Sequence, residues 1–530
     1  MPEFNEREYN VILHKGVDYD AFWADLQEIT NKDGIPNRQV EIANPRLGSY
    51  RQTHYWLTEA EKDELLEHPS VLNIEIPPSQ RTDIVKSHGI AYSGSFTRDP
   101  SLSTGDINWG LMRCNSQTNI YEGNEVVDRT YDYTLTGEGV DIVITDSGVQ
   151  TDHPEYADRY ISVDWGSVHG GFTQNANHDR DYDGHGTHCA GIAAGKTFGW
   201  AKKAKVHSLK IGGLEGTGDG STGIDDSYAM DAIKLWHRQK AIDPATGYKR
   251  PTVVNMSWGY SATFSGGHTS YAVNYRGTFY GSTTIQNDYG GELKAFGLNE
   301  FAPNIGALGT WKHPVRVDSL DTDIEEMVEE GIHVIIASGN SNHKIDVPTG
   351  ADYNNQALIS NTQWRYYHRG SSPYSANAFM VGCLDEDQVQ SGSNYVDKRS
   401  TFSNHGPGVD LYAPGASILS SVSNTSAYAR GSYHLNGSYW ESILNGTSMA
   451  APQVCGVVAL YAQSAPGLTP AKMKEVVLAN CSTTIYNPTE HISGSQSLQG
   501  GNVKLLFNKY GQSNPFTYTG SFTTTTDIGF

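Results

Sequence analysis

The sequence predicts an α/β protein with a mainly parallel sheet, preceded by a small α+β domain. Two observations support this fold class. After residue 108, short and fully apolar runs alternate with helical stretches, and such runs are typical of strands that are buried on both faces. Before residue 80, six elements follow one another in the order β-α-β-β-α-β, the arrangement of a split βαβ fold. The 530 residues are enough for both domains and for a large core.

The first domain is expected to span residues 1–80. Its first helix carries Phe22, Leu26 and Ile29 on one face, and Thr58 begins a sequence that fits a capping box. Topology alone leaves open whether this domain is an independent binding module. The expected elements are, in order, Tyr9–His14, Tyr19–Ile29, Gln39–Ile42, Ser49–Leu57, Glu59–Glu67 and Val71–Ile76.

A linker, a second domain and a tail are expected after the first domain. Residues 81–107 are polar, rich in Ser, Thr, Gly and Asp, and without periodicity, which is typical of a linker. Residues 108–511 are expected to form the second domain, with insertions near 259–308 and 342–375, and residues 512–530 to form a Thr-rich tail. The strands and helices expected in the second domain are Val140–Thr145, Val206–Ile211, Ser227–Lys240, Thr252–Met256, Ile324–Glu330, His333–Ala337, Ala378–Val381 and Met449–Gln463.

The charge balance excludes two classes of partner. The chain carries 38 basic and 59 acidic side chains, which gives a net charge of −21. Nucleic acids and anionic membranes attract surfaces rich in Lys and Arg, so neither is an expected partner. No apolar run reaches the roughly 18 residues that span a bilayer, and the N-terminus lacks the apolar core of a signal peptide. The compartment stays open between the cytoplasm, an assembled particle and non-classical export.

Three short segments hold an Asp, a His and a Ser in that order. Asp146 closes an apolar strand, where α/β sheets place catalytic groups, but a strand-end Asp is commonly structural. His185 lies between two glycines at the start of a helical stretch, and a single His there is more often structural than catalytic. Ser448 opens a long apolar helix, where a serine is normally a cap. The joint occurrence of all three in this order favours catalysis.

These segments resemble those of the subtilisin-like serine proteases (peptidase S8), and the string HGTHCAG is most similar to the proteinase K branch. The resemblance covers about residues 140 to 510 and implies a subtilisin-like three-layer fold. It also implies a serine endopeptidase that cleaves polypeptides through an acyl-enzyme, with the Asp, His, Ser order of subtilisins. The matching motifs are Asp146-Ser147-Gly148, His185-Gly186-Thr187-His188 and Gly446-Thr447-Ser448-Met449-Ala450-Ala451-Pro452.

The resemblance implies a role for each of four residues. His185 is expected to take the proton of Ser448 during attack and to return it to the leaving amine, while Asp146 holds the imidazole. The Ser448 N–H and the positive end of its helix are expected beside the developing oxyanion. Asn340, at the end of the string VIIASGN, is expected to supply the side-chain donor of the oxyanion hole.

The resemblance also implies which segments bind substrate. One expected wall of the primary specificity pocket follows the strand 252–256, the opposite wall follows the strand 333–337, and a glycine-rich edge would pair with the substrate backbone. Whether Trp258 lines the pocket or is merely structural stays open. The expected substrate-binding residues are Ser257, Trp258, Gly259, Ala337, Ser338, Gly339, Gly218 and Gly220.

The chain departs from the family pattern near the nucleophile. Gln453 stands where the family commonly has His, and Cys455 where a small Ala is usual. Cys189 follows His185 by four residues and is expected beneath the active site as a buried, inert thiol that mercurials would reach. The five cysteines lack CxxC spacing, which predicts free thiols and neither a disulfide scaffold nor a zinc site. They are Cys114, Cys189, Cys383, Cys455 and Cys481.

No cofactor is required by this chemistry, and no metal ligands are assigned. Calcium is common in the resembled family, and two acidic clusters offer carboxylate oxygens. Neither cluster matches an EF-hand pattern, so solvated acidic loops are the favoured interpretation. The clusters are Asp179, Asp181 and Asp183, and Asp219, Asp225 and Asp226.

The first domain resembles a subtilisin propeptide in topology, length and position. Such a propeptide assists folding and inhibits the protease by leaving its C-terminal tail in the cleft, so cleavage is expected between about Pro78 and Asp106. The segment Asn108–Arg113 resembles the start of mature proteases of the proteinase K branch. A fused binding domain, a catalytically idle protein of a larger assembly, and an esterase or peptide ligase remain the alternatives. Side-chain preference, natural substrate and oligomeric state are not encoded in any motif.

Overall fold

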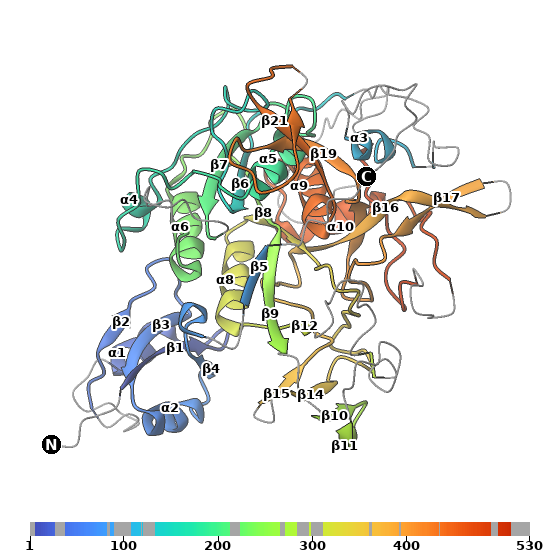
Figure 1. Ribbon diagram of the computed structural model, residues 1–530. Helices are drawn as coiled ribbons and strands as arrows, with labels where there is room; N and C mark the ends of the chain where they lie inside the picture. The colour runs from blue at the N-terminus through green and yellow to red at the C-terminus, as the bar shows by residue number, and fades with distance from the viewer. Residues whose placement is uncertain are drawn as a thin grey trace.

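Two domains pack against each other in the computed structural model of the protein (Figure 1). The N-terminal domain ends near residue 81, and the large domain extends from residue 108 to residue 509. Gly218, Asp219, Gly220 and the tail 512–530 lie outside the described residues. The structure describes residues 6–26, 38–81, 85–88, 108–117, 119, 133–212, 223–264, 271–283, 296–297, 311–359, 363–391, 394–433, 435–488 and 497–509.

The N-terminal domain is a four-stranded antiparallel sheet with two helices, in the predicted β-α-β-β-α-β order. The strand order is β2-β3-β1-β4, so the first and third strands are neighbours in the middle of the sheet. The predicted capping box is present, because the Thr58 hydroxyl accepts from the Glu61 N–H and the Glu61 carboxylate accepts from the Thr58 N–H. The elements are β1 (Arg7–Leu13), α1 (Tyr19–Leu26), β2 (Ile42–Asn44), β3 (Gln52–Leu57), α2 (Glu59–Leu66) and β4 (Val71–Glu75).

The large domain is built on a mainly parallel sheet, as the sequence predicts. Its order is β17-β16-β13-β8-β6-β7, and β18 pairs with β16 beside this path. Every pairing is parallel except that of β17 with β16. Because the strands run in one direction, their carboxyl ends meet at one edge. The strands are β6 (Asp141–Asp146), β7 (Lys205–Lys210), β8 (Thr252–Met256), β13 (His333–Ala337), β16 (Phe379–Ser391), β17 (Asn394–Arg399) and β18 (Leu411–Pro414).

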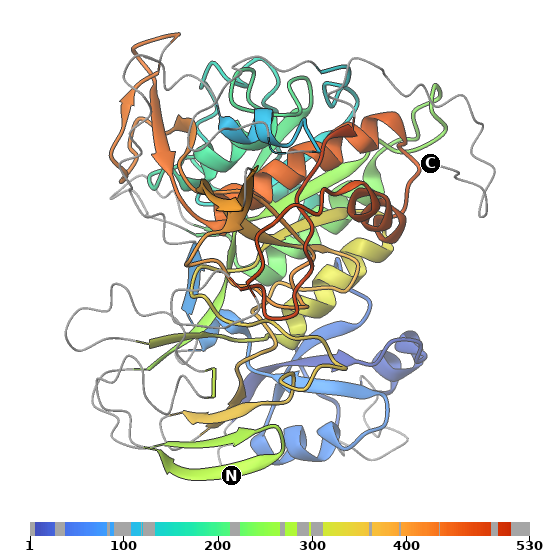
Figure 2. The same ribbon diagram turned by 90° about the vertical axis from the view of Figure 1, so that its right-hand side faces the viewer.

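Helices cover both faces of this sheet. Helices α5 and α9 pack against each other on one face, and α6 and α8 pack against each other on the face toward the N-terminal domain (Figure 2). Residues 447–462 of α9 are all buried, which explains their nearly unbroken apolar composition. The helices are α3 (Trp109–Arg113), α4 (Trp165–His169), α5 (His185–Ala194), α6 (Asp226–Gln239), α8 (Asp318–Glu329), α9 (Thr447–Ser464) and α10 (Pro470–Asn480).

A small three-stranded sheet joins the segment between the domains to the large domain. Its order is β12-β9-β5, and all pairings are antiparallel. The polar segment expected as a linker therefore contains the strand β5 (Val85–His88), and a 3-10 turn at Pro78–Gln80 precedes this segment. The segment expected as an insertion from residue 259 begins instead inside β9 (Trp258–Phe264), which pairs with β12 (Trp311–Pro314).

The two expected insertions meet in one further sheet. Its order is β11-β10-β14-β15, with β10 (Tyr271–Tyr275) and β11 (Thr278–Thr283) from the first insertion. The second insertion supplies β14 (Gln356–Ile359) and β15 (Gln363–Tyr366). The buried side chains of Val273, Ala357 and Tyr367 form a small core there, separate from the main core.

A last small sheet combines β19 (Ile418–Val422), β20 (Gly431–Ser432) and β21 (Trp440–Leu444). It lies against α5, because β19 packs on that helix. Within the described ranges, none of the helices has the length and the apolar character that a bilayer span requires.

Candidate active site

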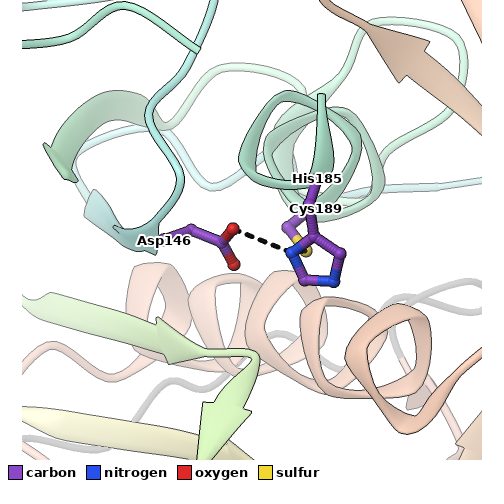
Figure 3. Close-up of side chains that lie close together, drawn as sticks. All are labelled: Asp146, His185 and Cys189. Carbon is purple, nitrogen blue, oxygen red and sulfur yellow. Dashed lines mark hydrogen bonds and ion pairs between the residues drawn. The ribbon is translucent and has the colours of Figure 1, made fainter. Parts of the chain in front are cut away.

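Asp146 and His185 are brought together by the end of one strand and the start of one helix. Asp146 is the last residue of β6 and His185 is the first residue of α5. The Asp146 Oδ1 atom lies 2.8 Å from the His185 Nδ1 atom, and both side chains are fully buried (Figure 3). Because an ionised carboxylate only accepts, the Nδ1 atom of the imidazole must donate. The pair therefore fixes the tautomer in which Nε2 is left to act as a base.

The protonation of His185 is controlled by Asp146. Burial alone would lower the pKa of the imidazole, but the adjacent Asp146 carboxylate raises this pKa well above its usual value. The carboxylate thus stabilises the imidazolium that forms when the ring accepts a proton. This electrostatic arrangement suits a general base that must hold a proton only briefly.

The loop before α5 is held tightly against the end of β6. A side chain at Gly186 is excluded, because its Cβ would lie 2.0 Å from the Gly148 carbonyl oxygen. The buried Asp181 carboxylate accepts hydrogen bonds from the Ser147 hydroxyl at 2.9 Å and from the Gly184 N–H at 2.8 Å. These contacts explain why the first turn of α5 carries glycines and why the position of His185 is rigid.

Ser448 lies in the first turn of α9, where the helix meets β8 and α5. Its hydroxyl donates to the Ser257 carbonyl oxygen at 3.1 Å. Its own carbonyl oxygen accepts from the Ser257 hydroxyl at 2.9 Å and from the Cys189 thiol at 3.4 Å. The backbone of the nucleophile candidate is therefore fixed from both neighbouring elements, while its hydroxyl is held at the end of β8.

The Asn340 amide nitrogen and the Ser448 backbone nitrogen both lie close to the α-carbon side of Gly446. The Asn340 Oδ1 atom accepts from both the N–H and the hydroxyl of Thr447 at 2.8 Å, which fixes the orientation of the amide. A Cβ atom added to Gly446 would lie 3.3 Å from Asn340 Nδ2 and 3.5 Å from the Ser448 nitrogen. The absence of a side chain at Gly446 thus leaves room for an oxygen atom beside both donors. Two donors around one open position are what an oxyanion hole requires.

The two expected walls of the specificity pocket have different structures. Ser257 is fully buried, and the Trp258 indole is 2% exposed and donates to the Thr145 hydroxyl at 3.2 Å. The Trp258 indole is therefore structural, and only the backbone of this residue is available to line the pocket wall. On the other side, the Ser338 N–H donates to the Val381 carbonyl oxygen and the Gly339 N–H donates to the Thr447 hydroxyl. Ala337 is the last residue of β13.

The strand β5 lies beside β9 and leads toward Ser448. The register is antiparallel, with Val85 opposite Ser261 and His88 opposite Trp258. Ser257, the residue before Trp258, carries the carbonyl oxygen that the Ser448 hydroxyl contacts. The strand β5 therefore runs along β9 toward the end at which Ser257 lies (Figure 1).

The fold and this geometry agree with the comparisons with known proteins. Residues 137–512 match the sequence profile of the subtilase family, peptidase S8. The chain belongs to the subtilase family. The predicted subtilisin-like fold is thereby confirmed, and a subtilase from Fervidobacterium pennivorans, fervidolysin, shares it with a TM-score of 0.52. The alignment with fervidolysin covers 97% of this chain and 62% of that chain at 16% identity.

Two fungal proteins illustrate the sequence similarity to other subtilases. The subtilisin-like serine protease pepC of Aspergillus niger is 29% identical over 388 residues, which cover 70% of this chain and 51% of that protein. The subtilisin-like serine protease Pen c 2 of Penicillium citrinum is 27% identical over 382 residues, which cover 70% of this chain and 60% of that protein. The chain thus spans between half and two thirds of the length of these relatives.

Cys189 is the third side chain of the buried group at His185. Its Sγ atom lies 3.9 Å from His185 Nδ1, one helical turn along α5 (Figure 3). Burial raises the pKa of this thiol, which keeps it protonated at neutral pH. The ligand atoms of Asp146, His185 and Cys189 all lie within 4.8 Å of one another, so a thiol-seeking metal bound here would contact the base.

Gln453 has a role that the sequence analysis missed. Its Oε1 atom accepts from Asn108 Nδ2 at 3.1 Å and from the Trp200 indole at 2.7 Å, and its Nε2 atom donates to Asn108 Oδ1 at 2.9 Å. This reciprocal pair of amides ties the first residue of the large domain to α9. The sequence did offer a signal for this role, because Gln453 departs from the family pattern. A Gln side chain can both donate and accept a hydrogen bond, as the paired amides require.

Three carboxylates of the two acidic clusters accept hydrogen bonds from the protein itself. Both oxygens of Asp181 accept from protein donors, namely Ser147, Asp183, Gly184 and Thr187. Asp225 accepts from the Ser227 N–H as the cap of α6, and Asp226 accepts from the Tyr260 hydroxyl. These hydrogen bonds occupy part of the lone-pair capacity that the three carboxylates could offer to a cation.

Proposed function

We propose that the protein is a serine endopeptidase that hydrolyses polypeptides through an acyl-enzyme on Ser448. The observation that carries this proposal is the convergence at one edge of the sheet of a buried Asp–His pair, a helix-start serine and two N–H donors. A catalytically idle subtilase of a larger assembly has no physical need for all of these groups together. Family membership and similarity to proteins that are named serine proteases support the same reaction.

The proposed reaction begins with rotation of the Ser448 hydroxyl from the Ser257 carbonyl toward His185 Nε2. The imidazole takes the hydroxyl proton while the oxygen attacks the substrate carbonyl, and the oxyanion accepts from Asn340 Nδ2 and the Ser448 N–H. The imidazolium, stabilised by Asp146, then protonates the leaving amine. Water repeats the sequence, releasing the acid product and restoring Ser448. Every group belongs to the chain itself or to water, so this hydrolysis requires no cofactor.

We also propose that the N-terminal domain is a propeptide which the enzyme removes itself. The support is the position of β5, which lies on β9 where an extended substrate would add a strand. Since His88 lies opposite Trp258, and the neighbouring Ser257 carbonyl contacts the Ser448 hydroxyl, the bond cleaved is expected within about two residues after His88. This narrows the range of Pro78 to Asp106 that the sequence alone predicts.

Labelling with a fluorophosphonate tests the proposed activity. The wild-type chain is expected to react at one serine and to shorten by its N-terminal domain, whereas S448A should neither label nor shorten. S438A is the matched control, because Ser438 is exposed and lies outside the site. N-terminal sequencing of the shortened wild-type chain should begin close to residue 90. A wild-type chain that folds but neither labels nor shortens would favour the idle alternative.

A further inference from the structure

The interface between the two domains contains a buried arginine. Arg46 belongs to the N-terminal domain but is only 1% exposed, because its guanidinium lies between α6 and α8 of the large domain. Its Nε atom lies 3.1 Å from Asp231 Oδ2, and its Nη2 atom lies 2.7 Å from Asp323 Oδ1. Gln52, the neighbour of Arg46 in space, accepts from Arg46 Nη1 and donates to Asp323.

Arg46 completes a cluster that the large domain leaves unbalanced. Lys234 contacts Asp231, Asp323 and Glu326 at 3.2, 2.9 and 2.6 Å. With Arg46 present, two cations face three carboxylates. Without the N-terminal domain, Lys234 is the ammonium that still faces all three, and His169 lies 3.8 Å from Asp231. With fewer positive charges beside them, the three carboxylates would repel one another, so the large domain alone carries a site that favours a guanidinium.

The pKa shifts in the cluster agree with a preference for a guanidinium at this site. Burial alone would raise the pKa of Asp231, but the Arg46 guanidinium and the Lys234 ammonium hold it below its usual value. Burial opposes the charge on Arg46 as well, and the two aspartates raise its pKa above the usual value. Arg46 and Asp231 are therefore both charged, and separating them in a buried site is costly. Burial raises the pKa of the second partner, Asp323, although Arg46 and Lys234 oppose this shift.

The other ion pairs across this interface are more exposed. Lys15 pairs with Glu329, but its side chain is 69% exposed. Arg51 pairs with Glu325, whose side chain is 48% exposed. Exposed pairs contribute little to binding because water screens them. Among the described residues of the interface, Arg46 is the cation with both carboxylate partners nearly inaccessible to water.

We propose that Arg46 retains the N-terminal domain on the protease after the connecting chain has been cut. The cleaved domain then remains as a bound inhibitor, with β5 in the cleft, until it is degraded or displaced. The partner that the carboxylate cluster recognises is a buried guanidinium of the chain's own propeptide. This inference rests on the proposed self-processing, and it identifies the residue that sets how long inhibition lasts.

The experiment compares self-processed full-length chains carrying R46M or K15M with the wild type. Each variant removes one positive charge from the same interface, but only R46M removes a buried one. After cleavage, size-exclusion chromatography measures whether the two fragments co-elute, and a chromogenic peptide measures free protease. The wild type and K15M are expected to co-elute with low activity. R46M is expected to lose its N-terminal fragment and to bind it about 10²- to 10³-fold more weakly.

A second variant, D323N, tests the same ion pair in case R46M does not fold. D323N keeps the shape of the cluster and leaves the N-terminal domain unchanged, and its folding is checked by fluorophosphonate labelling. It is expected to release the cleaved fragment as R46M does. Retention equal to that of the wild type in cleaved R46M or in labelled D323N overturns the role of Arg46. Failure of the wild type to cleave at all contradicts the proposed self-processing instead, so the two failures are distinguishable.

Discussion

Asp146 Oδ1 lies 2.8 Å from His185 Nδ1, although the two residues come from different elements separated by 39 positions. The parallel sheet explains this relationship, because the carboxyl end of β6 is also the edge at which α5 begins. The contact couples the charge of the imidazole to a buried carboxylate, and this coupling makes the pH dependence of the enzyme predictable.

D146N is expected to change both the rate and its pH dependence. Asp146 raises the pKa of His185 above 6.5, and the base works only when neutral, so activity should rise as the pH increases through that raised pKa. Without the carboxylate, burial alone lowers the pKa, so the acid limb of kcat/KM should move to lower pH. The rate should fall about 10⁴-fold, as for the same change in other triads. D158N, an exposed aspartate, is the control; an unmoved acid limb in D146N would contradict the assignment.

N340A and G446A are expected to impair the same step in different ways. N340A removes one oxyanion donor, which should lower kcat about 10²–10³-fold, the loss found for such a donor in a subtilisin. G446A keeps both donors but places a methyl group 3.3 and 3.5 Å from them, where the oxyanion would lie. A comparable loss of kcat is therefore expected. G437A is the control, because nothing lies within 4 Å of its added methyl group; full activity in G446A would place the oxyanion elsewhere.

C189A is expected to retain activity and to gain resistance to mercurials. The thiol is protonated and takes no part in the proposed reaction, but a mercury atom on Sγ would lie close to His185, 3.9 Å away. Inhibition by mercuric chloride measures the difference. C481A should stay as sensitive as the wild type, because Cys481 caps the C-terminus of α10, which contributes no residue to the candidate site. Equal sensitivity of C189A and the wild type would show that mercury acts at another thiol.

R113M is expected to destabilise the large domain. Arg113 in α3 binds the Asp397 carboxylate through Nε at 2.9 Å and Nη2 at 2.7 Å, and both side chains are almost fully buried. Removing one partner leaves a buried charge, which should cost about 3–5 kcal/mol of the free energy of unfolding. Denaturant unfolding in an S448A background, which prevents autolysis, measures this cost. D397N should lower the free energy of unfolding by a similar amount. The loss in the double variant should be smaller than the sum of the two single losses.

Local sequence patterns predicted much of the architecture. The predicted capping box at Thr58 is present. The strands 252–256 and 333–337 have the predicted bounds, because short apolar runs are buried in whatever tertiary arrangement the chain adopts. The positions of Asp146, His185, Asn340 and Ser448 at strand or helix ends followed from the same patterns. These features depend on residues a few positions apart, and so they can be read from the sequence.

Contacts between distant residues were decided only by the tertiary structure. Trp258 was ambiguous in the sequence, because an indole suits a pocket wall and a core equally well, and only the position of Thr145 determined its direction. The segment 85–88 carries no strand pattern, yet β9 offers it free backbone groups and so makes it a strand. Likewise, the sequence around Arg46 does not indicate a buried ion pair, because its carboxylate partners come from the distant helices α6 and α8. The sequence by itself predicted the fold class and the four candidate site residues, whereas long-range pairing decided the register of β5 on β9 and the charge balance between the domains.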